Sequence, residues 1–156
     1  MKHPVEYKVV ALRECATDVP YCDTPDRAAE YWREHIATDP RFNPEQEQFV
    51  VLMLNTRKRI KGHQVVALGT LDTINVHARE TFRAAIISAA QAIIVMHNHP
   101  SGDPTPSDSD IRVTRDFIRA GQLLKIELLD HIVIGQRSIE CPNGYASIRD
   151  LGYFFI

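Results

Sequence analysis

The sequence predicts an α/β fold, or α+β by a stricter definition, in which helices flank one mixed β-sheet. Short apolar segments alternate with helical segments along the chain, a pattern typical of a layered fold around a central sheet. A short polar turn joins two of the apolar segments, so at least one pair of strands is antiparallel. The chain has 156 residues, 44% of them hydrophobic and 24% charged, which suits one globular unit with one core.

The first 44 residues predict one strand, a linker and one helix. Residues 5–13 (VEYKVVALR) are typical of an edge strand. Thr24 is suited to cap a helix, because a proline and then an acidic residue follow it in the first turn. We expect this helix to reach about Thr38 and a proline-containing loop to follow.

The middle of the chain predicts a hairpin, a helix and a buried strand. Residues 49–55 (FVVLMLN) are apolar on both faces, which is typical of a central strand. A polar turn leads from them to residues 64–71 (QVVALGTL), and we expect the two segments to pair as a hairpin. The alanine-rich residues 77–90 have helical spacing, and residues 92–96 (AIIVM) form a short buried strand that ends in a polar loop.

The C-terminal third predicts a longer helix, two strands and a short final helix. The longer helix begins at Ser107 and is expected to end near Ala120, where Gly121 follows. Strands are expected near residues 124–134 and 137–141, and the short helix over residues 145–151.

Charge and cysteine content narrow the function classes. The net charge is −2 and the pI about 6.4, so no overall basic field attracts nucleic acid. The sequence contains no apolar run of membrane-spanning length and no secretory signal at its start, and we expect a cytoplasmic protein. The cysteines have neither metal-site nor redox spacing, which indicates three reduced thiols: Cys15, Cys22 and Cys141.

The residues that carry chemistry follow the buried strand at 92–96. His97 and His99 stand two positions apart, so both side chains leave the strand on the same face. Asp110 lies in the first turn of the next helix, after a proline-stiffened loop that can bring it back. Two histidines and one carboxylate leave one tetrahedral position open, as in a catalytic zinc site. The pair Ser107 and Asp110 is equally a helix capping box, which needs no metal.

The spacing H-x-H-x7-S-x-x-D resembles the signature of the JAB/MPN (JAMM) zinc metalloprotease family. It is formed here by His97, His99, Ser107 and Asp110. Further motifs resemble the bacterial RadC-like branch more closely: HNHPSGDPTPS from residue 97, LNT at 54–56, GTLD at 69–72, VHARE at 76–80 and DHIVIG at 130–135. The resemblance implies a JAB/MPN domain with cytidine-deaminase-like architecture over residues 45–156. Residues 1–44 are expected to pack on it as one structural unit.

The same resemblance implies a role for each motif residue. His97, His99 and Asp110 are the implied zinc ligands, and Ser107 supports the tetrahedral intermediate by hydrogen bonding. The implied activity is that of a zinc metallopeptidase, which hydrolyses a peptide or isopeptide bond in a peptide or protein substrate. Zinc polarises the scissile carbonyl and lowers the pKa of water toward about 7.

An upstream glutamate at the start of a strand is the general base of these peptidases. By position that residue is Glu47, directly before the central strand. Glu45 has the same side-chain parity and is the alternative. Read without the family, either residue is a solvated acid in front of a strand.

Four neighbouring residues receive secondary interpretations. Asn98 points away from its histidine neighbours and is expected to brace the loop. Asp103 is expected to stabilise a turn in front of a proline. His131 either supports or lines the site, with Asp130 orienting its imidazole, or is a structural histidine on a half-buried strand.

Two other functions compete with hydrolysis. The first is a DNA-repair or anti-restriction accessory that binds nucleic acid, with the metal site structural, vestigial or nucleolytic. Residues 57–59 (RKR) with Lys61 are the basic cluster that could contact phosphates. Against it, full-length RadC-like proteins carry an N-terminal helix-hairpin-helix segment, and the first 44 residues are too few to form one. The second is a metal-free interaction scaffold. An exposed strand edge would also allow a homodimer.

Overall fold

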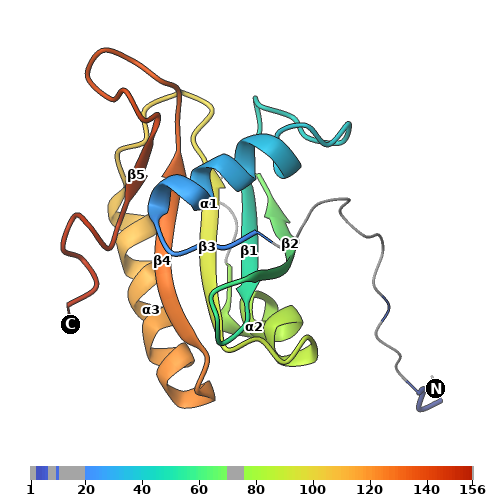
Figure 1. Ribbon diagram of the computed structural model, residues 1–156. Helices are drawn as coiled ribbons and strands as arrows, with labels where there is room; N and C mark the ends of the chain where they lie inside the picture. Colours follow the sequence, from blue (N-terminus) through green and yellow to red (C-terminus); the bar gives the residue numbers. More distant parts are fainter. Residues whose placement is uncertain (1–2, 7–9, 11–19, 70–75, 156) are drawn as a thin grey trace.

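The computed structural model describes residues 3–6, 10, 20–69 and 76–155, and within them the helices and strands form one layered body (Figure 1). A mixed five-stranded sheet carries helices on both faces, which confirms the predicted α/β class. The strands are β1 (Gln48–Leu54), β2 (Ile60–Leu68), β3 (Ala92–Asn98), β4 (Glu127–Ile134) and β5 (Tyr145–Ser147). The helices are α1 (Pro25–Tyr31), which continues as a π-helical turn (Trp32–Ile36), α2 (Ala78–Ile87) and α3 (Asp108–Leu124).

The strand order is β2-β1-β3-β4-β5, and only one neighbouring pair is parallel. β1 pairs antiparallel with both β2 and β3, β3 pairs parallel with β4, and β4 pairs antiparallel with β5. Every residue of β1 and β3 is buried, as expected for central strands that are apolar on both faces. The parallel connection from β3 to β4 runs through α3, so α3 begins at the end of the sheet where β3 finishes.

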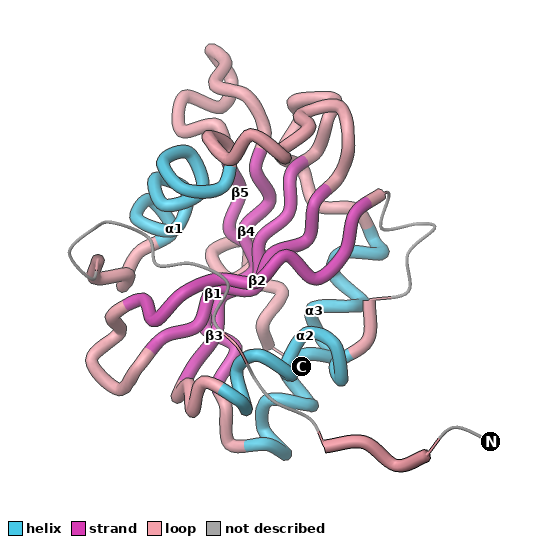
Figure 2. The backbone as a smooth tube through the Cα atoms, turned by 90° about the vertical axis from the view of Figure 1, so that its right-hand side faces the viewer, coloured by secondary structure: helices cyan, strands magenta, loops and turns pink. Residues whose placement is uncertain are grey.

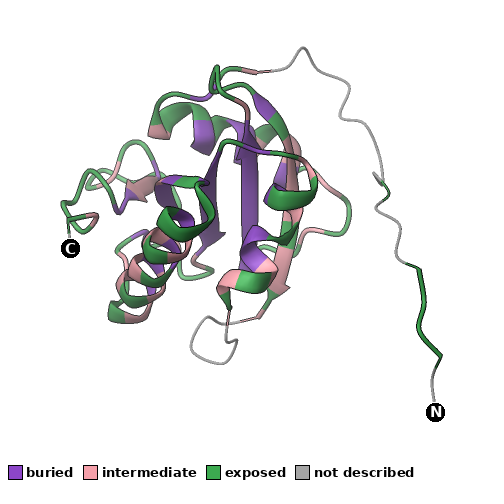
Figure 3. Ribbon diagram, turned by 90° about the horizontal axis from the view of Figure 1, so that it is seen from below, coloured by how far each residue is buried: buried purple, intermediate pink, exposed green. Residues whose placement is uncertain are grey.

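Each face of the sheet packs against its own helices (Figure 2). α1 and its π-helical turn cover one face, where Trp32 and Ile36 lie among buried residues of the central strands. α2 and α3 cover the other face through Phe82 and Phe117, which meet Phe49 and its neighbours. The buried residues consequently form two apolar clusters, one on each side of the sheet. Figure 3 shows that the buried residues are concentrated in the strands and on parts of the helices.

The start of α1 agrees with the sequence prediction. The Thr24 hydroxyl accepts a hydrogen bond from the backbone N–H of Arg27, and Pro25 occupies the first helical position. The strand predicted over residues 5–13 lies mostly outside the described residues, and the described positions within it, 5, 6 and 10, adopt no regular structure.

Three predictions about local structure are wrong. α3 does not end near Ala120 but continues to Leu124, and the left-handed residue Lys125 terminates it. Residues 137–141 form no strand, since Ser138 and Cys141 close a turn with hydrogen bonds to each other. The helix predicted over residues 145–151 is instead the short strand β5 followed by hydrogen-bonded turns.

Candidate metal centre

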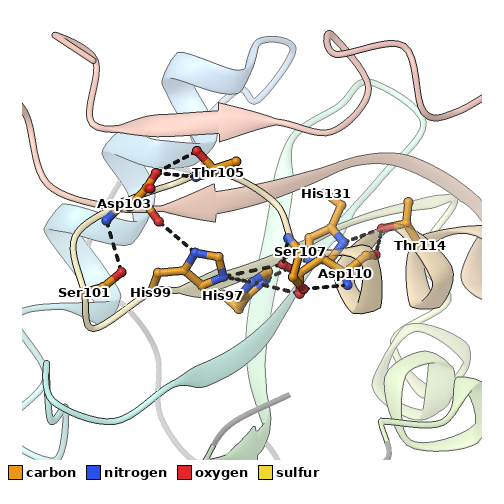
Figure 4. Close-up of polar contacts among 9 residues, drawn as sticks. All are labelled: His97, His99, Ser101, Asp103, Thr105, Ser107, Asp110, Thr114 and His131. Atoms are coloured by element: carbon orange, nitrogen blue, oxygen red, sulfur yellow. Dashed lines mark hydrogen bonds and ion pairs between the residues drawn. The ribbon is translucent and has the colours of Figure 1, made fainter. Parts of the chain in front are cut away.

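The candidate site forms where three elements meet at one end of the sheet (Figure 4). β3 supplies His97 and, directly after its last residue, His99. The first turn of α3 supplies Asp110, which the loop after β3 brings back toward the histidines. β4 runs parallel to β3 and places His131 beside His97.

The three side chains converge closely enough to share one ion. The Nε2 atoms of His97 and His99 lie 3.1 Å apart. His97 Nε2 is 3.3 Å from Oδ1 of Asp110, and His99 Nε2 is 3.4 Å from Oδ2. One ligand atom from each residue can be chosen so that all lie within 4.8 Å of one another. These three residues can therefore hold a metal ion.

Asp110 gives the site its negative charge. The residue is fully buried, which by itself raises the pKa of its carboxyl group, but the contacts with His97 and His99 outweigh burial and hold this pKa well below its usual range. Its Oδ1 atom has no hydrogen-bond partner among the described residues, because the contact to His97 has the distance of an ion pair without hydrogen-bond geometry. An unpaired buried carboxylate oxygen beside two imidazoles fits a cation.

The motif residues and the fold together suggest a family, and the comparison with known proteins decides it. The family model described as the RadC-like JAB domain matches residues 22–153. The chain belongs to the RadC-like JAB domain family. The resemblance drawn from the sequence motifs is thereby confirmed, and the match begins early enough to include α1.

Curated proteins named UPF0758 are similar to this RadC-like chain. One from Bacillus cereus is 42% identical over 130 residues, which cover 83% of this chain and 53% of the relative. One from Staphylococcus carnosus is 44% identical over 131 residues, covering 84% and 53%. One from Methanosarcina acetivorans is 41% identical over 115 residues, covering 73% and 48%. The chain spans about half the length of the curated relatives it matches.

The loop of the RadC-like site is fixed around His99. His99 Nδ1 lies 2.8 Å from the carbonyl oxygen of Asp103 and donates to it, which leaves Nε2 facing Asp110. Burial lowers the pKa of His99, but Asp110 and the Asp103 carbonyl outweigh burial and raise it. The Asp103 side chain accepts hydrogen bonds from the backbone N–H and the hydroxyl of Thr105, so it stabilises a turn as predicted.

A close approach between two loops holds the same segment from the other side. A Cβ atom on Gly135 would lie only 2.4 Å from the carbonyl oxygen of Gly102, so this position needs glycine. The backbone N–H of Gln136 donates to that same carbonyl at 2.8 Å, and the backbone N–H of His99 donates to Ile134 at 2.8 Å. The end of β4 thus anchors the loop that carries His99.

Ser107 and Asp110 form the capping box that the sequence allowed. The Ser107 hydroxyl oxygen accepts from the backbone N–H of Asp110 at 3.1 Å, and the backbone N–H of Ser107 donates to Asp110 Oδ2 at 2.8 Å. The capping box and the metal group are compatible, because the cap engages Oδ2 and leaves Oδ1 unpaired. Ser107 itself is exposed, and its hydroxyl still has a proton to donate.

Glu47 lies directly before β1, whose Phe49 pairs with His97. It is half-buried, and its negative charge contributes to the raised pKa of His99. Asn98 holds this segment, whereas the sequence predicted that it braces the loop after β3. Its Oδ1 accepts from the backbone N–H of Gln48 at 2.8 Å, and its Nδ2 donates to the carbonyl of Gln46 at 3.0 Å.

Sequence reasoning missed Thr114 and misassigned Asp130. The Thr114 hydroxyl lies 2.6 Å from His131 Nδ1, and His131 Nε2 lies 2.8 Å from His97 Nδ1. Burial lowers the pKa of His131 well below its usual value. Asp130 does not orient this imidazole, because neighbouring strand residues point to opposite faces; it bonds the backbone of His131 and the hydroxyl of Ser147. The position of Thr114 one helical turn after Asp110 was the available signal.

Other predicted features lie away from the metal residues. The basic residues 57–59 are exposed in the turn between β1 and β2, at the end of β1 opposite His97. Burial raises the pKa of Cys22 to about 12, so it is a thiol at neutral pH, while Cys15 lies outside the described residues. Among the described residues, no helix is both long and apolar enough to cross a membrane.

Proposed function

We propose that this RadC-like chain is a zinc-dependent hydrolase that cleaves a peptide or isopeptide bond. The observation that carries the proposal is the converging group of His97, His99 and Asp110, in which a buried carboxylate oxygen is unpaired beside two imidazole nitrogens. Two neutral nitrogen ligands and one carboxylate are a donor set that zinc accepts, and three protein ligands leave one position open for chemistry.

A zinc ion held by these residues supplies a Lewis acid for the scissile carbonyl and lowers the pKa of water in the site. The Glu47 carboxylate is the base that takes the proton of the attacking water and passes it to the leaving amine. Its charge acts on His99, which supports Glu47 over Glu45 for this role. The Ser107 hydroxyl donates its remaining proton to the negative charge that develops on the carbonyl oxygen.

Metal content is the first test of this proposal. Protein purified without an affinity tag is analysed for zinc by elemental analysis, and wild type is compared with His99→Ala. We expect about one zinc per chain in the wild type and its loss in the variant, because three ligands cannot be reduced to two without a large loss of affinity. If the wild-type protein takes up no zinc after incubation with the ion, the hydrolase proposal is overturned.

Hydrolysis is tested with synthetic probes that represent both bond types. One set consists of a library of peptides blocked at both ends, and the other of peptides joined through a lysine side-chain amide. Mass spectrometry detects the cleaved products. Glu47→Gln should retain zinc and lose turnover by roughly 100-fold or more, the usual contribution of a general base. Glu45→Gln is the matched control and should keep both. Full activity of Glu47→Gln would remove Glu47 from the mechanism.

A further inference from the structure

A chain of short contacts continues from His97 into the protein interior. His97 Nδ1 is 2.8 Å from His131 Nε2, His131 Nδ1 is 2.6 Å from the Thr114 hydroxyl, and that hydroxyl is 2.6 Å from the backbone carbonyl of Asp110. The chain begins at one proposed metal ligand and ends on the main chain of another. It links β3, β4 and α3 behind the site, as Figure 4 shows.

The number of protons fixes the direction of each hydrogen bond. The backbone carbonyl of Asp110 can only accept, so Thr114 gives it the single hydroxyl proton. The hydroxyl oxygen then accepts from Nδ1–H of His131. A neutral His131 has no second ring proton, so its Nε2 accepts from Nδ1–H of His97. Nε2 of His97, the atom that faces Asp110, is left as the nitrogen available to a metal.

Nothing from solvent competes with this arrangement. Thr114, His97 and His131 are each 0% exposed. The ring of Phe49 stacks on His97 with an interplanar angle of 19° and meets His131 edge to face at 81°. Within the described part of the chain, the two imidazoles have each other, Thr114 and the residues of the metal site as their hydrogen-bond partners.

His99 has its Nδ1 proton held in a different way, and the comparison shows what the series of hydrogen bonds does for His97. A backbone carbonyl, that of Asp103, receives Nδ1–H of His99 directly. Nδ1 of His97 instead faces Nε2 of His131, a ring nitrogen that can accept or donate. A neutral His131 can fix the tautomer of His97 only if its own ring proton stays on one nitrogen. Thr114 keeps that proton on Nδ1 of His131, because its hydroxyl oxygen accepts a hydrogen bond there.

We propose that Thr114 and His131 are positioning residues that hold the proton of His97 on Nδ1 and so keep Nε2 free to bind the metal. The inference rests on the metal site of the proposed function and adds two residues that lie outside the H-x-H-x7-S-x-x-D signature. Outer residues of this kind typically change metal affinity by about 10–100-fold when they are substituted.

The test substitutes Thr114 and leaves every proposed ligand intact. Thr114→Val keeps the size of the side chain but removes the hydroxyl, so His131 Nδ1 loses its acceptor and its proton can move to Nε2. That proton would then face His97 Nδ1 and drive the His97 proton onto Nε2, where it blocks the metal. We expect Thr114→Val to bind zinc about 10–100-fold more weakly. Thr114→Ser keeps the hydroxyl and should bind zinc within about threefold of wild type.

A second readout distinguishes positioning from simple loss of structure. The protein is labelled with ¹⁵N in its histidine rings, and long-range ¹H–¹⁵N NMR spectra of the zinc-free protein report which ring nitrogen carries the proton. In wild type and Thr114→Ser, His97 should be protonated on Nδ1; in Thr114→Val it should not. Thr114→Ala, which also lacks the hydroxyl and adds no bulk, carries the test if the valine variant does not fold.

The two proposals can fail separately. We call the hydrogen bonds from His97 through His131 to Thr114 the relay. If wild type binds zinc and Thr114→Val binds it as tightly with the same His97 tautomer, the relay proposal is contradicted while the hydrolase proposal is not. If wild type binds no zinc, the hydrolase fails, and the ring spectra of the zinc-free variants alone decide the relay. If Thr114→Ser, which keeps the hydroxyl, loses zinc to the same extent as Thr114→Val, the hydroxyl does not account for the zinc affinity and the proposed role of Thr114 is overturned.

Discussion

Asn98 stands between the two histidines of the site, yet its side chain acts on a different strand. Its amide bonds the carbonyl of Gln46 and the backbone N–H of Gln48, one residue on each side of Glu47. Asn98 is only 6% exposed and Gln48 is buried as well, so the bond between them is shielded from water. The side chain therefore sets the position of the proposed base relative to the strand that ends in the proposed ligands.

Asn98→Ala should affect the proposed base, Glu47, without affecting the proposed metal ligands. It leaves the buried N–H of Gln48 unpaired, which should lower the free energy of unfolding by about 1–3 kcal/mol in urea denaturation. Zinc content should remain at the wild-type value, whereas turnover should fall because Glu47 is no longer held. Asn98→Asp keeps the acceptor for Gln48 and should lose less stability. Loss of zinc in the alanine variant would show that Asn98 supports the ligands themselves.

At the scale of single residues, the sequence predicted the features that local spacing determines. Alternation along a strand placed His97 and His99 together, and the capping pattern placed Asp110. Thr114 was not predicted, because its role depends on contact with His131, a residue 17 positions later on another strand. Strand pairing decides which side chains of β4 face α3, and a local sequence pattern does not reveal this pairing.

At the scale of elements, the end of α3 shows how tertiary packing overrides a local signal. Glycine commonly ends a helix, but Gly121 lies inside α3 and is buried. A Cβ atom there would lie 2.4 Å from the carbonyl oxygen of Ile126 and 3.5 Å from Phe82. Gly121 therefore lets the helix approach the start of β4 closely, which the sequence could not indicate without the neighbouring chain.

Gly121→Ala should destabilise the protein although alanine is the better helix former. The gain in helix propensity is about 1 kcal/mol, whereas a clash with a backbone atom cannot be relieved by a rotamer change and should cost up to about 3 kcal/mol. We expect a net loss of about 2 kcal/mol, measured by thermal or urea unfolding. Gln122→Ala, on the exposed side of the same helix, is the control and should change stability by less than about 0.5 kcal/mol. An unchanged or raised stability of Gly121→Ala would contradict the close packing.

Across the whole molecule, the candidate site lies at the carboxyl ends of the one parallel pair of strands among the described residues. β3 and β4 run side by side, and α3 crosses between them so that its N-terminal turn reaches the same end. Ligands commonly bind at such an end, where loops and helix starts converge. The sequence predicted β3, β4 and α3 but not the order of the strands, and that order brings His131 beside His97.

Asp130 on β4 holds β5 and the turn that follows it through hydrogen bonds. Its carboxylate accepts hydrogen bonds from the Ser147 hydroxyl on β5 at 2.6 Å and from the backbone N–H of Arg149 at 3.2 Å. Burial raises the pKa of Asp130 to about 6, and these hydrogen bonds only partly oppose it. The folded chain therefore keeps a proton on Asp130 at pH values where the unfolded chain has lost it.

This difference gives the stability of the whole molecule a defined pH dependence. An acid whose pKa is raised on folding stabilises the folded state fully below its unfolded pKa, and this contribution is lost as the pH rises to about 6. A shift of about 2 units corresponds to about 3 kcal/mol at most. Asp130→Asn cannot titrate, so its unfolding free energy relative to wild type should rise between about pH 4 and pH 7. Urea denaturation across this range measures the difference, with Asp116→Asn on the exposed side of α3 as the control for net charge. A variant that falls or stays constant relative to wild type over this interval would show that the buried carboxyl does not retain its proton.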